Sequence, residues 1–361
     1  MFNIDRKVFT HFDYMIVFTT IPIVLLSLQL IYEVDLSLTI RQLFYIAFTL
    51  VISFIVFILP IRQLFWFVPF FYWGSILLLL SVETFGVKKF GAQRWLEIPF
   101  IGMSLQPSEF VKLSLILMLA YNINNNPPPK EGYNLKNFLK HLFFILIPVI
   151  LVKIQPDLGT SVLIFIVGYG VLFLVGIYKK IIIASLVIFI VSLPILYIGL
   201  QDYQLQRIES FISSDVKYQV KQSMIAIGSG GFVGKDIENA TQAQLKFLPV
   251  PESDFIFAYF TERHGFLGGM LLIILYGLLI LHLFSISFRH KKDRILQVVS
   301  ASIGFLVFIH FSINILMVMK LAPVVGIPLP FFSYGGSSFL TFGILFAIVQ
   351  NLLAFKYHFR V

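Results

Sequence analysis

The sequence contains no cysteine, which excludes disulfide bonds and thiolate chemistry. Charged residues make up only 12% of the 361 residues, whereas a soluble domain has roughly 25%. There is no Walker A sequence, so the chain is not expected to hydrolyse ATP. The histidines also lack the spacing of metal ligands, and they are His11, His141, His264, His282, His290, His310 and His358.

Apolar residues are abundant instead, at 58% of the chain, with 41 phenylalanines. Runs of roughly 18 or more apolar residues, the signal of a transmembrane helix, recur throughout. We predict an all-α polytopic membrane protein, a single domain over residues 1–361 with about ten transmembrane helices. The basic N-terminus precedes a full span without a small-residue cleavage site, so we expect a retained first helix. The expected spans are 14–33, 43–61, 64–82, 108–123, 139–154, 160–178, 181–200, 256–288, 296–318 and 338–355.

The basic residues predict how these spans are oriented, because Lys and Arg accumulate in short cytoplasmic loops. With the N-terminus inside, the inner loops hold 14 of the 27 basic residues but only four of the 18 acids. We therefore expect both termini to be cytoplasmic. The net charge of +9 is spread along these loops, so no nucleic-acid partner is expected. The inner basic residues are Arg6, Lys7, Arg62, Lys130, Lys136, Lys140, Lys179, Lys180, Arg289, Lys291, Lys292, Arg294, Lys356 and Arg360.

Three polar segments then face outward: 83–107, 201–255 and 319–337. The large loop 201–255, between the seventh and eighth helices, contains an amphipathic pattern that predicts a helix. That helix would either lie on the outer leaflet or present a solvated basic face. Its apolar positions are Val216, Val220, Met224 and Ile227, and its lysines are Lys217 and Lys221.

The first outward segment carries Arg94 and Trp95 before a span that begins near Pro107. Trp95 is interpreted either as an interfacial anchor or as part of a site. Ser108 is expected to cap the helix, and Glu109 lies in its first turn. Lys112 follows on the same face. An intramembrane lysine normally faces a partner or a cavity, so Lys112 either forms a structural pair with Glu109 or attracts an anionic headgroup.

Two more carboxylates lie where the chain is broken or rigid. Asp157 lies at a break made by Pro156 and Gly159, where it either caps the next helix or lines a cavity. Asp254 follows the sequence FLPVPES, in which Ser253 is expected to cap a helix that begins at Asp254. Glu262 lies two turns further along the same side of that helix. Asp254 is interpreted either as a helix-start acid or as a catalytic acid.

These residues predict an outward-facing cavity, bounded by lipid and lined with acids and bases. Amphiphiles with charged heads are suitable occupants. Three functions fit such a cavity: an enzyme that acts on lipid-linked substrates, a lipid translocator and a non-catalytic scaffold. A translocator would need polar residues through the full depth of the bundle, whereas spans such as 181–200 are apolar throughout.

Five motifs follow one another in a recognisable order and spacing: GAQRWL…QPSEFVKL, QPDLGTS, YQVKQSMIAIGSGG, LP…SDFIFA and GIPLPFFSYGGSS. Together they resemble the SEDS family (shape, elongation, division and sporulation). The resemblance extends from about residue 40 through nearly the whole chain. The last motif is similar to the RodA elongation branch rather than to the FtsW division branch.

The resemblance implies a peptidoglycan glycosyltransferase of the bacterial cytoplasmic (inner) membrane. It polymerises lipid II at the outer face of that membrane during cell elongation and releases undecaprenyl diphosphate. The resemblance also implies a class B penicillin-binding protein, the transpeptidase, as partner, together with membrane lipids. The family's essential aspartate falls on Asp254, and its other motif residues fall on Arg94, Trp95, Glu109, Lys112 and Asp157.

The chain departs from the family near this aspartate. Val250 stands where many relatives have an acid, an acid appears instead at Glu252, and Arg263–His264 replaces an acid and a leucine after Glu262. Asp254 and Glu262 themselves are retained.

The expected chemistry is attack by a sugar hydroxyl on an anomeric carbon while a diphosphate leaves. A hydroxyl is a weak nucleophile, so one general base is needed, and we assign this role to Asp254. Lys112 and Arg94 are expected to hold the diphosphate, and Glu109 to position Lys112. A divalent cation, Mg²⁺ or Mn²⁺, is expected to assist, with Asp157 or Asp254 as a candidate ligand.

Overall fold

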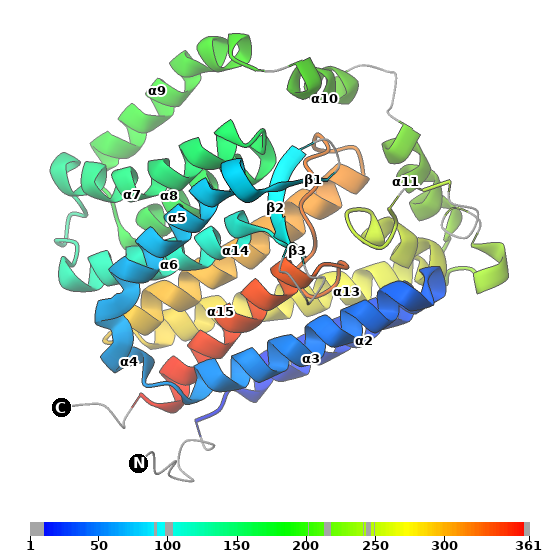
Figure 1. Ribbon diagram of the computed structural model, residues 1–361, viewed down its shortest axis with the longest axis horizontal. Helices are drawn as coiled ribbons and strands as arrows, with labels where there is room; N and C mark the ends of the chain where they lie inside the picture. The colour runs from blue at the N-terminus through cyan, green and yellow to red at the C-terminus, as the bar shows by residue number, and fades with distance from the viewer. Residues whose placement is uncertain are drawn as a thin grey trace.

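Long apolar segments fold as helices because a helix satisfies its own backbone hydrogen bonds. The computed structural model describes residues 11–89, 92–97, 104–200, 202–212, 218–240, 242, 247–248 and 250–356. Most of these residues lie in long helices that form a bundle (Figure 1). The long helices are α2 Tyr14–Val34, α3 Leu36–Ile58, α5 Val68–Phe85, α6 Pro107–Asn125, α7 Leu135–Ile154, α8 Leu158–Val175, α9 Lys179–Ile198, α13 Ile256–Arg289, α14 Arg294–Val318 and α15 Gly336–Ala354.

The predicted all-α polytopic fold is confirmed, because each predicted span coincides with one of these helices. The third span is preceded by a short helix, α4 Ile61–Leu64, and a 3-10 turn, η1 Phe65–Phe67. Among the described residues, eight helices are long and apolar enough to cross a membrane, with α4 to α5 taken as one. The predicted start of the second span, at residue 43, was too late in the chain. Helix α3 begins at Leu36, because the side chain of Asp35 caps it by accepting a hydrogen bond from Ser37 N.

Helix α6 lies inside the bundle, and almost every residue in its first fourteen positions is buried. It packs against α5, α7, α14 and α15, and Ser114 shares a 2.5 Å hydrogen bond with Ser75 of α5. Because protein surrounds this helix, it can carry Glu109 and Lys112 without exposing them to lipid.

Helix α9 differs from α6 in its surroundings, because it lies at the edge of the bundle (Figure 1). Its Ser185 hydroxyl hydrogen-bonds to Tyr169 of α8 at 2.5 Å. Most of its large apolar side chains are exposed, including Ile183, Leu186 and Ile188. In a bilayer this exposure presents an apolar surface to lipid or to another apolar helix.

The bundle has two different ends. Helix α2 begins and α15 finishes at one end, which we call the terminal end (Figure 1). The other end, which we call the loop end, carries a small antiparallel sheet, the helices α10 Asp202–Ile212 and α11 Tyr218–Ser229, the 3-10 turn η2 Ile237–Asn239, and the segment 322–335 that precedes α15. We refer to that segment as the 322–335 loop.

The sheet connects α5 to α6. Its strands are β1 Val87–Lys89, β2 Ala92–Glu97 and β3 Ser104–Leu105, in the order β1-β2-β3. Lys88 pairs with Gln93, and Leu96 pairs with Leu105. The first polar segment of the sequence is therefore folded, and β2 holds Arg94 and Trp95 in a fixed register.

The amphipathic helix predicted in the large loop is present as α11. Its buried face is formed by Val220, Ser223 and Ala226, and it packs against α13 and α14. Ser223 Oγ donates a 2.7 Å hydrogen bond to the carbonyl of Val318, at the end of α14. The helix thus turns one face to the protein, while Lys221 and Met224 are exposed. The predicted residues Val216 and Lys217 lie outside the described part of the chain.

Helix α13 is not continuous, contrary to the single span predicted at 256–288. Gly265 interrupts it with a φ of 65° and a ψ of −164°. A Cβ atom at this position would lie 2.3 Å from the backbone nitrogen of Gly234, so only glycine fits there. The break separates a short segment after Asp254 from the longer helix that continues to Arg289.

Candidate functional site

Arg94 lies at a joint between β2 and the break that separates α7 from α8. Its Nε donates to the carbonyl of Gln155 at 3.3 Å, and its Nη2 donates to the carbonyl of Pro156. Its Nη1 lies 3.4 Å from Asp157 Oδ2. The guanidinium therefore closes the broken helix end, and Trp95 beside it is half-buried and pairs with Val87 across the sheet.

Asp157 caps α8, as one of the two sequence interpretations predicted. Its Oδ1 accepts a hydrogen bond from Thr160 N at 3.2 Å, and its side chain is only 8% exposed. Both carboxylate oxygens thus have partners in the protein, the amide of Thr160 and the guanidinium of Arg94. This arrangement suits a carboxylate that holds a helix start in place.

Lys112 and Glu109 form a buried pair, with Lys112 Nζ 2.7 Å from Glu109 Oε1 and side-chain exposures of 3% and 6%. Lys112 Nζ also lies 3.2 Å from Nε2 of His310 on α14. The other ring nitrogen of His310 lies 3.0 Å from the carbonyl of Pro328. A neutral His310 satisfies both contacts if Nδ1–H donates to Pro328 and Nε2 accepts from Lys112. The pair is therefore connected to the 322–335 loop.

The expected cap at the start of α6 was wrong. Gln106 occupies the N-cap position, no side chain caps the helix, and Ser108 lies inside the first turn. The Ser108 hydroxyl is buried and has no hydrogen-bond partner in the described part of the chain. Pro107 explains the shift, because proline is favoured at the first helical position and starts the helix one residue earlier.

Asp254 lies just before α13, which begins at Ile256 with Phe255 as its N-cap and no side-chain cap. The predicted cap by Ser253 is therefore wrong: Ser253 Oγ donates instead to Asp254 Oδ1 at 3.1 Å. The backbone around the acid is held by other elements. Asn314 Nδ2 donates to the carbonyl of Asp254 at 3.0 Å, and Ser333 Oγ donates to the carbonyl of Ser253 at 2.8 Å.

The surroundings of Asp254 favour its protonated form. Burial raises the pKa of the Asp254 carboxyl above its usual value, although the Ser253 hydrogen bond and the charge of Arg207 on α10 act in the opposite direction. Burial also raises the pKa of the neighbouring Glu252, and the negative charges of Asp35 and Asp254 add to this effect. A carboxyl with a raised pKa is a stronger base once ionised, which suits proton abstraction.

The 322–335 loop joins the three clusters that the sequence analysis treated separately. Gly326, with a φ of 77°, is so close to the acid that a Cβ atom there would lie 3.2 Å from Asp254 Oδ2. Val325 packs on Gly159 at the start of α8, beside Asp157, and leaves no room for a Cβ atom at residue 159. Pro328 accepts the hydrogen bond from His310 and so reaches Lys112. The structure thus brings Arg94, Asp157, Glu109, Lys112 and Asp254 around one loop.

Glu262 lies apart from this group. Its side chain is fully buried, and Oε1 accepts a hydrogen bond from Gln242 N at 3.3 Å, while its backbone carbonyl accepts from Lys235 N. The predicted alignment of Asp254 and Glu262 on one helix face does not occur, because Asp254 precedes the helix. Glu262 instead anchors the segment that leads from α11 back to α13.

The basic residue after Glu262 forms a cluster that the sequence did not reveal. Arg263 makes a bidentate pair with Glu33, from Nε to Oε2 at 2.7 Å and from Nη2 to Oε1 at 3.1 Å. The Tyr259 hydroxyl donates to the same Glu33 at 2.8 Å. The cluster connects the end of α2 to the first part of α13. Arg263, which replaces the acid that many relatives have at this position, therefore has an acidic partner in this chain, Glu33.

The described residues contain no group of three or more His, Asp or Glu side chains arranged to hold a metal ion. Asp157, one of the two candidate ligands, is engaged by Thr160 and Arg94. Asp254, the other, accepts a hydrogen bond from Ser253. The donor set therefore does not fit a resident ion held by protein groups alone.

Two residues that sequence reasoning missed are His310 and Asn314. Both are buried on α14, one helical turn apart, and both bind the 322–335 loop: Asn314 Nδ2 donates to the carbonyl of Ile327 at 2.8 Å. Their signal was present in the sequence. Polar residues four positions apart in an otherwise apolar span usually face a partner.

The chain has clear similarity to known proteins. Residues 4–358 match the protein family described as FTSW_RODA_SPOVE, cell cycle protein. Over 356 residues the chain is 48% identical to the peptidoglycan glycosyltransferase MrdB of Helicobacter pylori, covering 99% of this chain and 93% of that protein. It is 36% identical over 362 residues to MrdB of Escherichia coli K12, covering 97% and 96%.

Solved structures give the same fold. One, described as "Structural coordination of polymerization and crosslinking by a peptidoglycan synthase complex", contains a chain that aligns with a TM-score of 0.82 at 24% identity, covering 96% of this chain and 98% of that one. The rod shape determining protein RodA of Thermus thermophilus aligns with a TM-score of 0.71 at 24% identity, with the same coverage. At these identities the likeness supports the fold alone.

Proposed function

This chain belongs to the FtsW, RodA and SpoVE family of cell cycle proteins, and on that premise we propose that it is a peptidoglycan glycosyltransferase. Its relatives at 48% and 36% identity carry that name over nearly their whole length. The reaction transfers a lipid-linked sugar to a growing glycan strand, with lipid II as donor and undecaprenyl diphosphate as leaving group. The protein lies in the bacterial inner membrane, with both termini cytoplasmic and the loop end outward.

The single observation that supports this proposal most is the way Asp254 is held. The carboxyl lies at the loop end, beside Gly326, and its backbone is fixed by Asn314. Glu252 is fixed as well, because its carbonyl accepts a 2.8 Å hydrogen bond from Tyr334 N. A general base must be held within hydrogen-bond reach of the proton that it removes, and this network restricts the position of Asp254.

The reaction needs one base and no protein acid. The attacking hydroxyl oxygen forms a bond to the anomeric carbon, and its proton passes to Asp254. The bond from that carbon to the diphosphate oxygen breaks, and the electron pair leaves with the diphosphate. Diphosphate departs without protonation when its charge is neutralised, so cations near the site replace the second carboxyl of glycoside hydrolases.

The contacts of the other motif residues lead us to propose different roles for them. Lys112 is 3% exposed and paired with Glu109, and Arg94 is directed into the joint beside Asp157. We propose that both position the 322–335 loop and the α7–α8 break, and thereby the cavity around Asp254. Glu262 has a corresponding role for the segment that follows α11.

We still propose that a divalent cation, Mg²⁺ or Mn²⁺, takes part, but as an ion that is bound together with the substrate. Magnesium usually keeps several waters and binds through one or two carboxylates together with substrate phosphates, so it would arrive with the diphosphate rather than reside in the protein. When bound with the diphosphate it would supply charge neutralisation, and the Asp254 or Glu252 carboxylate is a candidate donor to it. Polymer synthesis is expected to stop in excess EDTA and to recover with added Mg²⁺; full activity in EDTA would remove the ion from the scheme.

The proposed partner is a class B penicillin-binding protein, the transpeptidase that crosslinks the strands. Support comes from the aligned chain of a peptidoglycan synthase complex, whose description names both polymerisation and crosslinking. Coexpression with affinity capture from membranes tests it: a transpeptidase retained by the wild-type chain, and not by an unrelated polytopic protein, is the expected result.

Activity is tested with the purified protein in vesicles that contain fluorescent lipid II. Polymer on a gel, together with release of undecaprenyl diphosphate, is the expected result. Movement of lipid II from one leaflet to the other without polymer would instead identify a translocator. Vesicles with heat-inactivated protein provide the control for both readings.

A further inference from the structure

The helix that directly follows Asp254 is separated from the rest of α13. It covers residues 256–264, and Gly265 ends it with a non-helical backbone. We refer to it as the short helix, and its residues 256–262 are all buried. Because the break at Gly265 lies between the two parts of α13, the long transmembrane part does not by itself fix the direction of the short helix. Contacts with other elements must do so.

Two side chains of the short helix, one helical turn apart, bind the same carboxylate, Glu33 of α2. The Arg263 guanidinium donates to both oxygens of Glu33, at 2.7 and 3.1 Å, and the Tyr259 hydroxyl donates to it at 2.8 Å. The side chains of Glu33 and Arg263 are only 4% and 11% exposed. A bidentate pair fixes the direction of its two groups as well as their distance, so these contacts orient the short helix relative to α2.

The position of Glu33 is not explained by the helix that carries it. Glu33 lies in the last turn of α2, which ends at Val34. The C-terminal end of a helix has a partial negative charge, so a carboxylate there is unfavourable unless a cation lies close by. Its burial adds a cost of desolvation, which the bonds from Arg263 and Tyr259 offset. The partners on the short helix therefore account for this acid.

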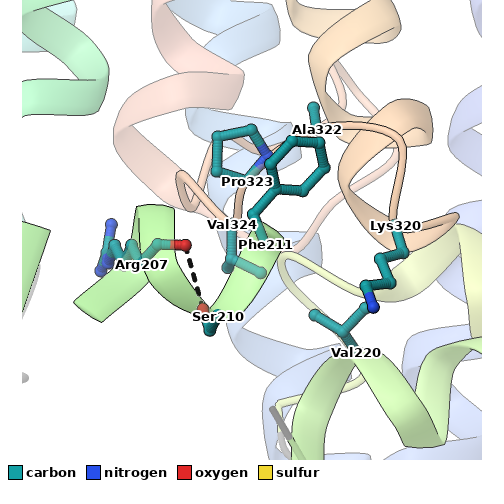
Figure 2. Close-up of a pocket in the computed structure, with 8 residues that line it drawn as sticks. All are labelled: Arg207, Ser210, Phe211, Val220, Lys320, Ala322, Pro323 and Val324. Carbon is teal, nitrogen blue, oxygen red and sulfur yellow. Dashed lines mark hydrogen bonds between the residues drawn. The ribbon is translucent and has the colours of Figure 1, made fainter. Parts of the chain in front are cut away.

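Helix α2 also holds the 322–335 loop, the other element beside Asp254. Ser27 Oγ donates a 2.5 Å hydrogen bond to the carbonyl of Phe332. The ring of Phe332 packs edge-to-face against Phe260 of the short helix, with 5.4 Å between the centroids. The first residues of the loop, 322–324, are partly exposed and border a shallow pocket beside α10 and α11 (Figure 2). The end of the loop is thus fixed to a transmembrane helix, and the same helix holds the short helix.

Helix α2 is a suitable support because it is attached to α13 at both of its ends. The two helices lie side by side (Figure 1). At the terminal end Asp13 Oδ2 lies 2.7 Å from His282 Nε2, and at the loop end Glu33 pairs with Arg263. The sequence distance from Asp13 to Glu33 corresponds to about 30 Å of helix, which is about the thickness of the hydrocarbon core. The support therefore extends across the membrane.

Small rotations of the short helix would move Asp254, because the acid lies beyond one end of this helix and Arg263 lies near the other. The helix from residue 256 to residue 263 is about 10 Å long. A rotation of about 6° about the Arg263 end would displace the start of a helix of that length by about 1 Å. A misplacement of about 1 Å can cost about 10²-fold in rate. The contact at Arg263 is thus able to control the position of the acid.

We propose that Glu33 and Arg263 are positioning residues for the transfer reaction. Their ion pair fixes the short helix against α2 and so holds the Asp254 carboxylate where it can take the proton of the attacking hydroxyl. This inference rests on the proposed function, in which Asp254 is the base. Since the pair acts through Asp254 and not on the substrate, its loss lowers kcat for lipid II polymerisation and leaves KM unchanged.

The first test replaces the whole cluster by apolar groups in the variant Glu33→Leu/Tyr259→Phe/Arg263→Met. Exchanging a buried ion pair for apolar residues of similar size is often neutral or stabilising, so the Tm should stay close to that of the wild type. Methionine is flexible and does not fix a direction, so kcat should fall about 10²-fold, with KM unchanged. A wild-type kcat together with a wild-type Tm would overturn the proposal.

The conservative variant Arg263→Lys decides the matter if the triple variant does not accumulate. Lysine keeps the charge but binds as a point charge, without the two-pronged geometry of arginine. Its kcat should fall about tenfold, a partial loss of the positioning effect. The matched control is Asp13→Asn, which removes the charge at the other end of the same two helices, while asparagine still caps α2. Its kcat should equal that of the wild type, and equal values of kcat for Arg263→Lys and the wild type would overturn the proposal.

A double-mutant cycle tests whether the pair acts through Asp254. The effects of residues that act as a unit are not additive. In the Asp254→Asn background the base is absent, so adding Arg263→Lys should cause no further loss of the residual rate. The same loss of rate in both backgrounds would show that the pair acts elsewhere and would overturn the proposal.

Hydrogen exchange of the full-length protein in detergent tests the support without an activity assay. Arg263→Lys should raise the exchange rate of the amides in 256–264 but not in 266–289, because the break separates the two segments. Asp13→Asn should leave exchange in 256–264 unchanged. Unaltered protection of 256–264 in Arg263→Lys would overturn the proposal. A wild-type protein that forms no polymer would refute the proposed function, and the exchange rates would still decide whether Glu33 and Arg263 hold the short helix.

Discussion

The two ends of the bundle use polar residues in different ways. At the terminal end they tie helix ends together: Asp13 N donates to Gln350 Oε1 at 2.9 Å, and Gln350 Nε2 donates back to the carbonyl of Asp13 at 2.7 Å. Asp13 Oδ2 also lies 2.7 Å from His282 Nε2. Arg62 and Asp293 form a 2.5 Å ion pair. These contacts close the end of the bundle.

The loop end uses polar residues to hold irregular backbone. All four non-glycine residues with a positive φ among the described residues lie there: Pro156, Val250, Lys320 and Phe331. At the other end, the connections with a positive φ use glycine, at Gly132 and Gly176. The loop end also has glycines with a positive φ, at Gly231, Gly234, Gly265 and Gly326. It therefore uses both glycine and other residues for this conformation, whereas the described part of the terminal end uses glycine alone.

This difference between the two ends indicates where the surrounding structure overrides the local backbone preference of a residue. Strained backbone persists only where neighbouring groups hold it, and it concentrates at functional sites. Close to these residues, Asn314, Ser333 and His310 hydrogen-bond to the backbone carbonyls of Asp254, Ser253 and Pro328. Polar residues at the terminal end connect helix ends to one another, whereas those at the loop end position the candidate site.

The largest expected effect is a difference in activity between two variants, one that changes a carboxylate at the loop end and one that changes a carboxylate at the terminal end. Asp254→Asn keeps the size of the side chain but cannot accept a proton, so polymerisation of lipid II should slow by about 10²–10⁴ with little change in Tm. Asp293→Asn breaks the partly exposed pair with Arg62 and should cost about 1 kcal/mol of stability at most, with activity retained. Gel assays and thermal melts of both variants check this, and similar activities would remove the distinction between the ends.

The buried pair on α6 should matter chiefly for stability. Lys112→Met leaves Glu109 with an uncompensated charge in a buried site, which costs about 3–5 kcal/mol. Adding Glu109→Gln should restore much of this loss, because no lone charge then remains. Denaturation of the single and double variants in the same detergent measures the effect. A single variant that melts like the wild type yet makes no polymer would show that Lys112 acts on the substrate.

The smallest expected effect concerns the strained approach to Asp254. Val250 has a φ of 50° and is 41% exposed. Asparagine tolerates the left-handed conformation better than valine, so Val250→Asn should stabilise the protein by about 1 kcal/mol. Val250→Ala keeps a Cβ atom, and with it most of the strain, so it serves as the control. Equal Tm values for the two variants would mean that this backbone is not strained.

The helices could be predicted from the sequence because the apolar runs are long and a helix is the only open-ended structure that a bilayer permits. The boundaries near Asp35 and Pro107 were less clear, since each depends on a capping or starting residue. The break at Gly265 escaped prediction because its cause is distant in sequence: the backbone of Gly234 lies against it.

The candidate site was predictable as a set of residues but not as an arrangement. Motif resemblance gave Arg94, Asp157 and Asp254. The 322–335 loop that joins them contacts them through close backbone approach at Gly326, packing of Val325 and the carbonyls of Ile327 and Pro328, and these contacts carry no sequence signal. Lys112 was assigned to the substrate because a lone lysine near a membrane surface suggests an anion. Its second partner, His310, lies 198 positions away in the sequence, so only the fold could reveal it.

The central claim is that Asp254 is the general base, and the pH dependence of kcat/KM for lipid II polymerisation tests it most directly. Burial holds the pKa of the Asp254 carboxyl above its ordinary value of 3.8. The base must be ionised, so the rate should rise with pH through that raised pKa. In Asp254→Asn the residual rate should be about 10²–10⁴ lower and should not show that ionisation. An unchanged acid limb in Asp254→Asn, at a rate near that of the wild type, would contradict the account.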